Sequence, residues 1–509
     1  MLQLIFGRCG SGKTHFVREW LKKLSEQGKE HLMLLVPEQS SFENERAMLR
    51  LLGEKNARRV EVTSFRRLVD AAQRRCGGFA GRRLDDGGRS IFMNLAIEQV
   101  RDRLEIFRKN ADSAELVNLM LQISTELKMC EITPQTLEKS SQNVPQSTLK
   151  RKMEEISLIL SAYDALVAQS YIDPLDDLTR LKNILAVHDF FRGYTIAVDS
   201  FQSFTVQEYD ILELMIKQAE QVYVTICAEG LSSPESGLFA IGCRTAKKLL
   251  RTAQENGVRT AAPVTLKSGV RFKNPAIAAL EAGVYRPARK IFGGSCKGVA
   301  VYEAKNRYDE ASFVCAAIRH LVKDEGFRYR DFAVISRSAD TYEGIMDSAM
   351  ERWEIPYFMD RPEPVDAEPL MRLILTAFSI VQRGFRSDDI FLYLKTGLAG
   401  LSSSQICELE NYTFVWGISG KRWKETWTDN PEGFAGEMKE QDKKLLGSVN
   451  ESRRAVTEPL ERFRKATEYT DGTGMASASY ALLCDIGAAE NLRKYAAILA
   501  ENATLLAEG

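Results

Sequence analysis

The chain has 509 residues, enough for about three domains, and it carries 69 basic and 69 acidic residues. This balance excludes a global electrostatic field that would steer the protein to nucleic acid, so any site for a polyanion must be a local patch. A composition of 44% hydrophobic and 27% charged residues excludes the disordered and collagen-like classes.

The first part of the chain alternates short apolar strands with amphipathic helices. A strand is predicted over 2–6, then a glycine-rich loop, and then a helix over 13–27. Further strands are predicted over 31–36 and 60–62, and an amphipathic segment over 65–75 follows. Such alternation predicts a parallel α/β sheet.

The pattern then becomes mostly helical, and strands return later. Strands are predicted over 194–198 and 222–226, with a helix over 206–218 between them. The helical stretch of about 89–180 is therefore read as an insertion into one α/β domain.

A second, unfinished α/β unit is predicted after a segment rich in proline and glycine. Strands are expected over 299–302 and 332–336, with a helix over 308–323 between them. From about residue 388 onward the sequence is helical or loop-like. The predicted domains are, in chain order, 1–88 with 181–262 (first α/β domain), 89–180 (helical insertion), 263–297 (connection), 298–387 (first part of the second α/β domain) and 388–509 (its helical insertion).

The glycine-rich loop carries the clearest chemical signal. Residues 7–14 read G-R-C-G-S-G-K-T and match the P-loop pattern G-x-x-x-x-G-K-[ST] between a predicted strand and a predicted helix. Glycines bring backbone N–H groups around a phosphate, the lysine reaches the β/γ oxygens, and the threonine binds Mg²⁺. An ordinary glycine turn is the alternative. The predicted ATP-binding residues are Gly7, Arg8, Cys9, Gly10, Ser11, Gly12, Lys13 and Thr14.

A second ligand for Mg²⁺ is expected at a strand end. The strand over 194–198 is followed directly by Asp199, which together with Thr14 is the predicted metal site. The alternative is that Asp199 caps the next helix, a common role for aspartate in α/β loops.

One segment is strongly basic. Residues 51–84 hold nine basic and three acidic residues, and Phe65 and Phe79 lie among them. Basic residues interleaved with aromatic ones are typical of a groove for single-stranded nucleic acid. The alternative is a solvated basic face that contacts an acidic partner subunit. The predicted DNA-binding residues are Thr63, Ser64, Phe65, Arg66, Arg67, Arg74 and Arg75.

The cysteines and histidines indicate no metal or disulfide chemistry. Nine cysteines are spread without a C-x-x-C pair, and no two of the four histidines have metal-ligand spacing. The chain begins without the features of an export signal, and no apolar run approaches the roughly 20 residues of a membrane span. A reduced, cytoplasmic protein without membrane contact is expected.

Several motifs resemble those of known helicases. The segment V-T-S-F-R-R-L over 62–68 is similar to the strand-end T-F-H segment of superfamily-one helicases of the UvrD and RecB type, and D-S-F-Q-S-F-T-V-Q over 199–207 resembles their D-E-F-Q-D motif. With the P-loop and L-V-P-E-Q over 35–39, this order resembles the AddB family, the B subunits of bacterial ATP-dependent helicase/deoxyribonucleases. The similarity continues through Y-R-D-F-A-V-I-S-R over 329–337 and covers nearly the whole chain.

The resemblance implies two RecA-like domains, the second incomplete, which bind ATP, Mg²⁺ and DNA, either single-stranded or as a duplex end. It also implies an AddA-type motor and nuclease subunit as partner in a heterodimer, and a role in processing double-strand breaks for recombinational repair. Arg337 resembles the arginine that reaches across the domain cleft to the γ-phosphate, with a surface ion pair as the alternative. The nuclease carboxylates and iron–sulfur cysteines of the family are missing from this sequence, so no iron–sulfur cluster is expected, and the remainder is expected on a longer or separate chain.

Departures from the helicase pattern predict a degenerate ATPase site. Ser200 stands where these helicases have a glutamate that aligns the attacking water, and its hydroxyl is too weak a base for that task. The G-D-x-x-Q segment after the next strand and the upstream glutamine motif are also missing. Two alternatives remain: a non-catalytic scaffold that holds DNA and a partner motor, and a stand-alone P-loop ATPase or kinase.

Overall fold

The structure, a computed structural model, describes residues 1–77, 81–231, 237–267, 269–285, 291–360, 365–434 and 437–501. The chain divides into two compact units, Met1–Glu303 and Ala304–Gly509.

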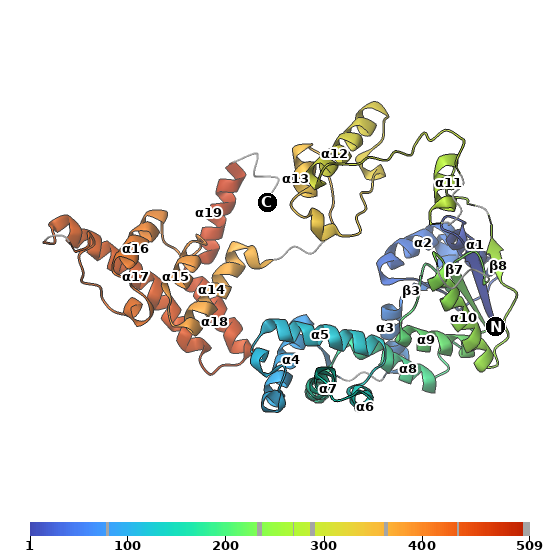
Figure 1. The fold of residues 1–509 in the computed structure, drawn as a ribbon, viewed down its shortest axis with the longest axis horizontal. Coiled ribbons are helices and arrows are strands. Elements are labelled where there is room, and N and C mark those ends of the chain that lie inside the picture. Colours follow the sequence, from blue (N-terminus) through green and yellow to red (C-terminus); the bar gives the residue numbers. More distant parts are fainter. Residues whose placement is uncertain are drawn as a thin grey trace. The chain divides into compact units, whose positions relative to one another are not determined.

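The first unit contains a parallel sheet, as the sequence predicts (Figure 1). Among the described residues its strand order is β3-β2-β6-β7-β1-β8, and every neighbouring pair is parallel. The strands are β1 (Leu2–Gly7), β2 (Leu32–Leu35), β3 (Val60–Thr63), β6 (Thr195–Val198), β7 (Gln221–Cys227) and β8 (Val264–Leu266). Although β6 and β7 follow the long helical stretch, they lie between β2 and β1. Strands from before and after the helical insertion therefore form one sheet.

Both faces of this sheet are buried. Leu4 and Phe6 point into one core and Ile5 into the other, because successive side chains of a strand alternate between faces. The first core is completed by α3 (Phe65–Cys76), α8 (Asp177–Val187), α9 (Val206–Gln218) and α10 (Ala240–Glu255), and the second by α1 (Lys13–Glu26) and α2 (Ser41–Ala57). Burial on both faces explains why the strands read as continuous apolar runs.

The inserted segment builds a helical core of its own around Met93, Met120 and Tyr163. Its helices are α4 (Asp86–Val100), α5 (Ala114–Met129), α6 (Pro134–Gln142) and α7 (Thr148–Val167), and a short parallel pair joins β4 (Arg82–Arg83) to β5 (Tyr171–Ile172).

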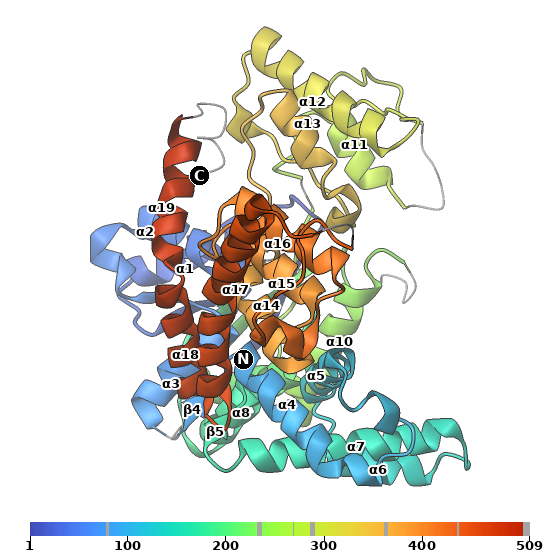
Figure 2. The same ribbon diagram turned by 90° about the vertical axis from the view of Figure 1, so that its left-hand side faces the viewer.

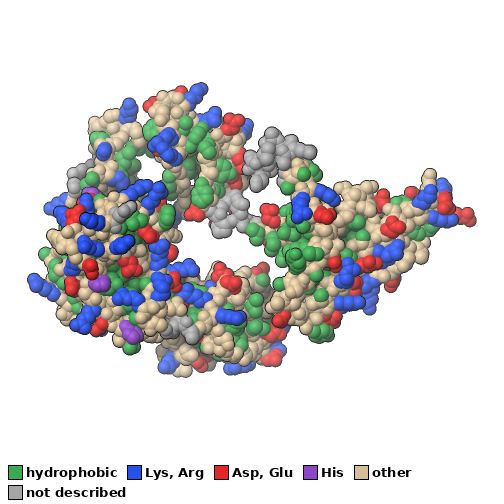
Figure 3. Space-filling view, turned by 180° about the vertical axis from the view of Figure 1, so that it is seen from behind, with side chains coloured by type: hydrophobic (Ala, Val, Ile, Leu, Met, Phe, Trp, Pro, Cys, Tyr) green, Lys and Arg blue, Asp and Glu red, His purple; other side chains and the backbone are tan. Residues whose placement is uncertain are grey.

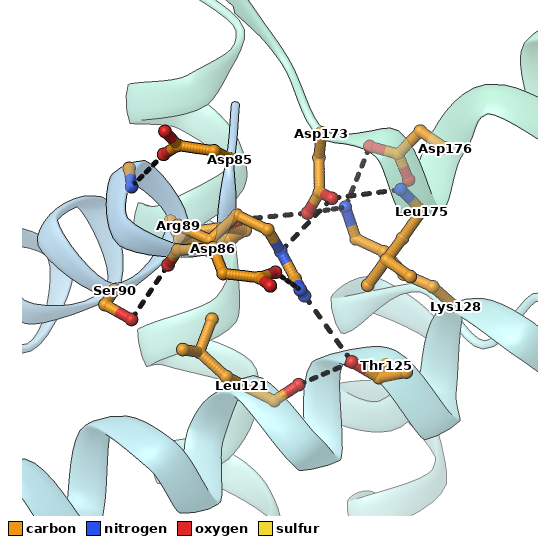
Figure 4. A network of polar contacts seen from close by, with 12 residues as sticks. Asp85, Asp86, Arg89, Ser90, Leu121, Thr125, Lys128, Asp173, Leu175 and Asp176 are labelled. Carbon is orange, nitrogen blue, oxygen red and sulfur yellow. Dashed lines mark hydrogen bonds and ion pairs between the residues drawn. The ribbon is translucent and has the colours of Figure 1, made fainter. Parts of the chain in front are cut away.

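A buried ionic cluster joins the insertion to the turn that leads into α8 (Figure 4). The ammonium of Lys128 on α5 lies 3.1 Å from Asp173 and 2.8 Å from Asp176, and Arg89 of α4 lies 3.4 Å from Asp173. Burial alone would raise the pKa of the Asp173 carboxyl, but Lys128, the N–H of Leu175 and Arg89 together hold that pKa below its ordinary value. The carboxylate therefore depends on these cations to remain ionised in the interior.

The second unit is helical in its described residues. α12 (Arg307–Asp324) packs on α13 (Met346–Arg352) through Cys315 and Met350. A larger core around Tyr412 and Trp423 is built by α14 (Pro369–Arg383), α15 (Ser387–Leu394), α16 (Ser403–Val415), α17 (Glu440–Thr467) and α18 (Gly472–Asp485), with α19 (Ala488–Glu501) following. Figure 2 shows α17 beside α18. This core includes residues on both sides of the expected boundary between 387 and 388. None of the described helices is both long and apolar enough to span a membrane.

Two strand predictions in this region are wrong. The segments 299–302 and 332–336 form no ladder in the described part of the chain, and Val301 and Ile335 are 96% and 91% exposed. A strand exists only where a neighbouring strand satisfies its backbone groups, and the described residues supply no such neighbour. Apolar runs alone therefore overpredicted sheet here, whereas the predicted helix between them is present as α12.

The Lys128 cluster yields a stability prediction. Lys128→Met should lower the free energy of unfolding by roughly 3–5 kcal/mol, because it leaves the Asp173 carboxylate buried without its nearest cation. Urea denaturation followed by circular dichroism measures the change. Because the pKa of Asp173 is depressed, the stability that its charge contributes is present above the ordinary aspartate pKa and is lost as the pH falls through the folded value. The difference between wild type and variant should therefore shrink in acid.

Lys152→Met is the matched control, since Lys152 lies exposed on α7 of the same insertion. This variant should change stability by no more than about 0.5 kcal/mol. If the two variants unfold alike, the ionic cluster does not hold the insertion as described.

Candidate nucleotide-binding site

The predicted P-loop lies in a cleft of about 640 Å³ at the carboxyl edge of the sheet. Because parallel strands all end at this edge, loops distant in sequence meet there. The cleft is lined by Cys9, Gly10, Ser11, Gly12, Lys13, Thr14, Asp199, Ser200, Thr225, Cys227, Val270 and Arg271, among others. The structure thus brings the predicted metal ligands, Thr14 and Asp199, into one cleft.

The loop conformation requires its glycines. Gly10 and Gly12 have φ angles of +72° and +90°, in the region that favours glycine, and a Cβ added to Gly7 would lie 2.2 Å from the Ser11 hydroxyl. Gly12 begins α1 without a side-chain cap, and the first turn holds no acidic residue. The first N–H groups of α1 are therefore left without a side-chain acceptor, the arrangement that binds anions.

Two polar side chains of the loop fit a bound phosphate. The Lys13 ammonium donates to the carbonyls of Gly7 (2.7 Å) and Arg8 (2.9 Å) and so lies along the loop. The Ser11 hydroxyl is buried and has no hydrogen-bond partner among the described residues. Buried polar groups are normally paired, so an acceptor such as a phosphate oxygen suits this position.

Arg8 has a different role from its loop neighbours. Its guanidinium forms ion pairs with Glu229 (2.7 Å) and with Glu281 (3.0 Å) of α11 (Pro275–Gly283), and it lies over the Phe239 ring. Burial would lower the pKa of Arg8, but the two carboxylates more than offset this and raise it. The Arg8 side chain therefore fastens α11 to the loop, with its charge already balanced.

Asp199 is 2% exposed at the end of β6. One carboxylate oxygen accepts from the Thr225 hydroxyl of β7 (2.6 Å) and the other from the Ser200 hydroxyl (3.2 Å). The cap of α9 is Thr205, in a capping box with Glu208, so the structure does not support the alternative that Asp199 caps this helix. Asp199 instead faces the cleft.

The donor set suits a metal ion that is also bound by phosphate. A hydroxyl and a carboxylate are oxygen ligands of the kind that Mg²⁺ prefers. Across the described parts of the chain, no three His, Cys, Asp or Glu side chains form a group that could hold a metal ion. Mg²⁺ at Thr14 and Asp199 would therefore need phosphate oxygens or water to complete its coordination.

The first three predicted DNA-binding residues are buried. Thr63 ends β3, and the Ser64 hydroxyl caps α3 and donates to the Glu38 carboxylate. Phe65 is 6% exposed and packs edge-on against Phe201. Its ring is therefore not available to stack on a base in this structure, and Phe79 lies outside the described residues.

The four predicted arginines fall at two separate ends of α3. Arg66 and Arg67 lie in the first turn, and Arg74 and Arg75 lie in the last, about 12 Å away along the helix axis. Arg67 forms an ion pair with Glu45 (3.0 Å), and Arg75 donates to the Tyr194 hydroxyl (2.9 Å) and stacks on the Phe190 ring, so one arginine at each end of α3 is already engaged. On the face that Figure 3 shows, basic and acidic side chains are interspersed.

Arg337 lies exposed in an irregular segment of the second unit. Its role toward a γ-phosphate remains a prediction.

Among the cleft residues that the sequence did not predict, three make contacts that shape the site. Thr225 lies within an apolar strand and gave no signal. Val270 and Arg271 belong to the segment interpreted as a connection, and both of their N–H groups donate to the Gly10 carbonyl (2.9 and 3.1 Å). The one sequence feature that could have indicated a place in the cleft was the basic side chain of Arg271 itself.

Comparisons with known proteins point to a single family. Residues 4–281 match the family model described as "ADDB, N-terminal". The chain is 32% identical over 502 residues (96% of the chain, 44% of the relative) to the B subunit of the ATP-dependent helicase/deoxyribonuclease from Acetivibrio thermocellus. It is 30% identical to the protein of the same name from Clostridium perfringens (91% of the chain, 41% of the relative), and 31% identical to that of Clostridium acetobutylicum (97% and 44%).

The chain therefore spans less than half the length of the curated relatives it matches. The family model itself covers more than half of the chain, from the P-loop strand through most of α11. The resemblance inferred from the motifs is thereby confirmed, and this chain belongs to the AddB N-terminal family.

Proposed function

We propose that the chain is the ATP- and DNA-binding, helicase-like portion of the B subunit of a helicase/deoxyribonuclease. In this proposal it works in the bacterial cytoplasm beside an AddA-type motor, as a heterodimer that processes double-strand breaks for recombinational repair. The observation that carries the proposal is the cleft that joins the P-loop to Asp199, in a chain whose relatives bear that enzyme's name. Helicase and nuclease activity are assigned to the whole assembly.

Within the cleft, each residue has a specific task. The loop N–H groups and Lys13 bind the β- and γ-phosphates, while Thr14 and Asp199 hold Mg²⁺. When bound, Mg²⁺ supplies positive charge to the phosphates. The Thr225 hydroxyl fixes the orientation of the Asp199 carboxylate toward the cleft.

The same cleft favours binding over turnover. Among the described residues that line the cleft, Asp199 is the one carboxylate. Asp199 accepts a hydrogen bond from Thr225 and is assigned to the metal. Ser200 has a left-handed φ of +69° and donates its hydroxyl to Asp199. No carboxylate is left among these residues to align an attacking water, so hydrolysis should be slow.

This observation also favours one second candidate, a non-catalytic scaffold. Such a scaffold would hold DNA and the motor without using nucleotide. A measurement of nucleotide binding therefore distinguishes the scaffold from the proposed ATP-binding subunit. A stand-alone P-loop ATPase or kinase is disfavoured by the match of more than half of the chain to the AddB N-terminal family. We further propose that the first unit is a RecA-like domain and that the second unit, which is helical in its described residues, supplies the helical part of a second such domain, with Arg337 contributing there.

Nucleotide binding is tested by Lys13→Ala. Wild type should bind ATP–Mg²⁺, and the variant should bind at least about 100-fold more weakly, because it loses charged hydrogen bonds to phosphate. Isothermal titration calorimetry measures both affinities. Lys23→Ala, an exposed lysine of the same helix, should bind like wild type. Equal affinity of wild type and Lys13→Ala would show that the loop does not bind nucleotide.

DNA binding is tested by charge reversal at the two ends of α3. For single-stranded DNA, the logarithm of the affinity should fall with the logarithm of salt concentration, by about 0.7 per phosphate contacted. Arg66→Glu with Arg67→Glu should flatten this slope, because these side chains are exposed at the carboxyl edge. Arg74→Glu with Arg75→Glu should change it less. If neither pair changes the slope, α3 faces a protein partner instead of DNA.

A further inference from the structure

The segment after β8 crosses directly over the P-loop. The N–H groups of Val270 and Arg271 both donate to the Gly10 carbonyl, and a Cβ added to Gly10 would lie 2.8 Å from the Phe272 ring. Further along, Glu281 of α11 binds Arg8 of the loop through its carboxylate and its carbonyl (2.6 Å). The segment is therefore fixed to the loop at two points.

This attachment places the Arg271 side chain in the cleft. Its guanidinium lies 4.0 Å from the Cys9 sulfur, and Arg271 lines the same cleft as Lys13 and Asp199. No ion pair joins it to a carboxylate within the described residues, whereas Arg8 has two such partners. Arg18, the other arginine of the cleft, donates to the Asn44 side chain (2.7 Å). Within the described part of the chain, Arg271 is thus a cation of the cleft that is paired with no carboxylate.

The position of Lys13 indicates which phosphate Arg271 would meet. In a P-loop the lysine reaches the β- and γ-phosphates, and here its ammonium lies at the carbonyls of Gly7 and Arg8. The next residue is Cys9, beside which the Arg271 guanidinium lies. Lys13 and the Arg271 guanidinium therefore lie at the same end of the loop, the end whose lysine serves the β- and γ-phosphates.

The charges of the cleft favour the same assignment. With Asp199 also present, Mg²⁺ and Lys13 do not balance the negative charge of a nucleoside triphosphate. A guanidinium is always protonated and binds phosphate oxygens in a bidentate manner. We infer that Arg271 is a further nucleotide-binding residue, which contacts the terminal phosphate of a nucleoside triphosphate and makes the site prefer triphosphate over diphosphate.

This inference rests on the proposed nucleotide binding. It assigns the cation that contacts the terminal phosphate to the first unit, which also contains the P-loop. Arg271→Ala should weaken ATP–Mg²⁺ binding about tenfold and ADP–Mg²⁺ binding less than threefold, as expected for the loss of one charge-assisted hydrogen bond to the terminal phosphate. Arg271→Lys should recover part of the ATP affinity. The alanine variant should fold normally, because Arg271 is attached to the loop through its backbone N–H.

Lys273→Ala is the matched control, since Lys273 is exposed two residues further on and does not line the cleft. Calorimetry with ATP–Mg²⁺ and ADP–Mg²⁺ on the four proteins decides the matter. If wild type binds nucleotide and Arg271→Ala either keeps the wild-type affinity for both nucleotides or loses affinity for both by the same factor, the assignment to the terminal phosphate is overturned while the proposed site stands. If wild type binds neither nucleotide, the proposed site fails and the inference fails with it.

Discussion

The parallel pairing of β7 with β1 on one side and β6 on the other is the constraint on which the cleft depends. It sets Gly7 opposite Cys227 and Val198 opposite Val224, so Asp199 and Thr225 come next to each other at the strand ends. Their 2.6 Å hydrogen bond follows from this register. A slip by one residue would turn Thr225 to the other face of the sheet and remove the bond. The P-loop and Asp199 lie far apart in the sequence, and strand pairing brings them together.

The charged residues around the P-loop fall into two groups: one attaches α11 to the loop, and the other leaves positive charge facing the cleft. Arg8 is balanced by Glu229 and Glu281 and serves to hold α11 in place. The first turn of α1, by contrast, holds Lys13 and no acidic residue, so the cleft end of that helix stays positive. Catalysis by phosphoryl-transfer enzymes needs further groups that act on the transition state. Ser200 of the cleft stands at the position where the helicase resemblance places such a base, and for this reason we propose that the cleft holds a nucleotide without rapid turnover.

The sequence predicted those features whose signals are local. The P-loop, the helix after it and Asp199 at a strand end all depend on neighbouring residues, and the strands of the first unit read as buried because both faces of the sheet are covered. The strands expected over 299–302 and 332–336 failed because a strand needs a partner that local hydrophobicity does not reveal. Phe65 was misjudged for a related reason, since its burial depends on Phe201 from a distant loop. Arg271 was missed because a connection without periodicity gives no hint that it returns to the loop.

In the proposed function, the cleft retains ATP without hydrolysing it rapidly. The most direct measurement mixes excess protein with radiolabelled ATP and Mg²⁺, with and without single-stranded DNA, and quenches samples over time to separate ATP from ADP. We expect the protein-bound nucleotide to be recovered as intact ATP over minutes, and none to be retained by Lys13→Ala. Conversion of the bound ATP to ADP within a second, abolished by Lys13→Ala, would contradict this proposal.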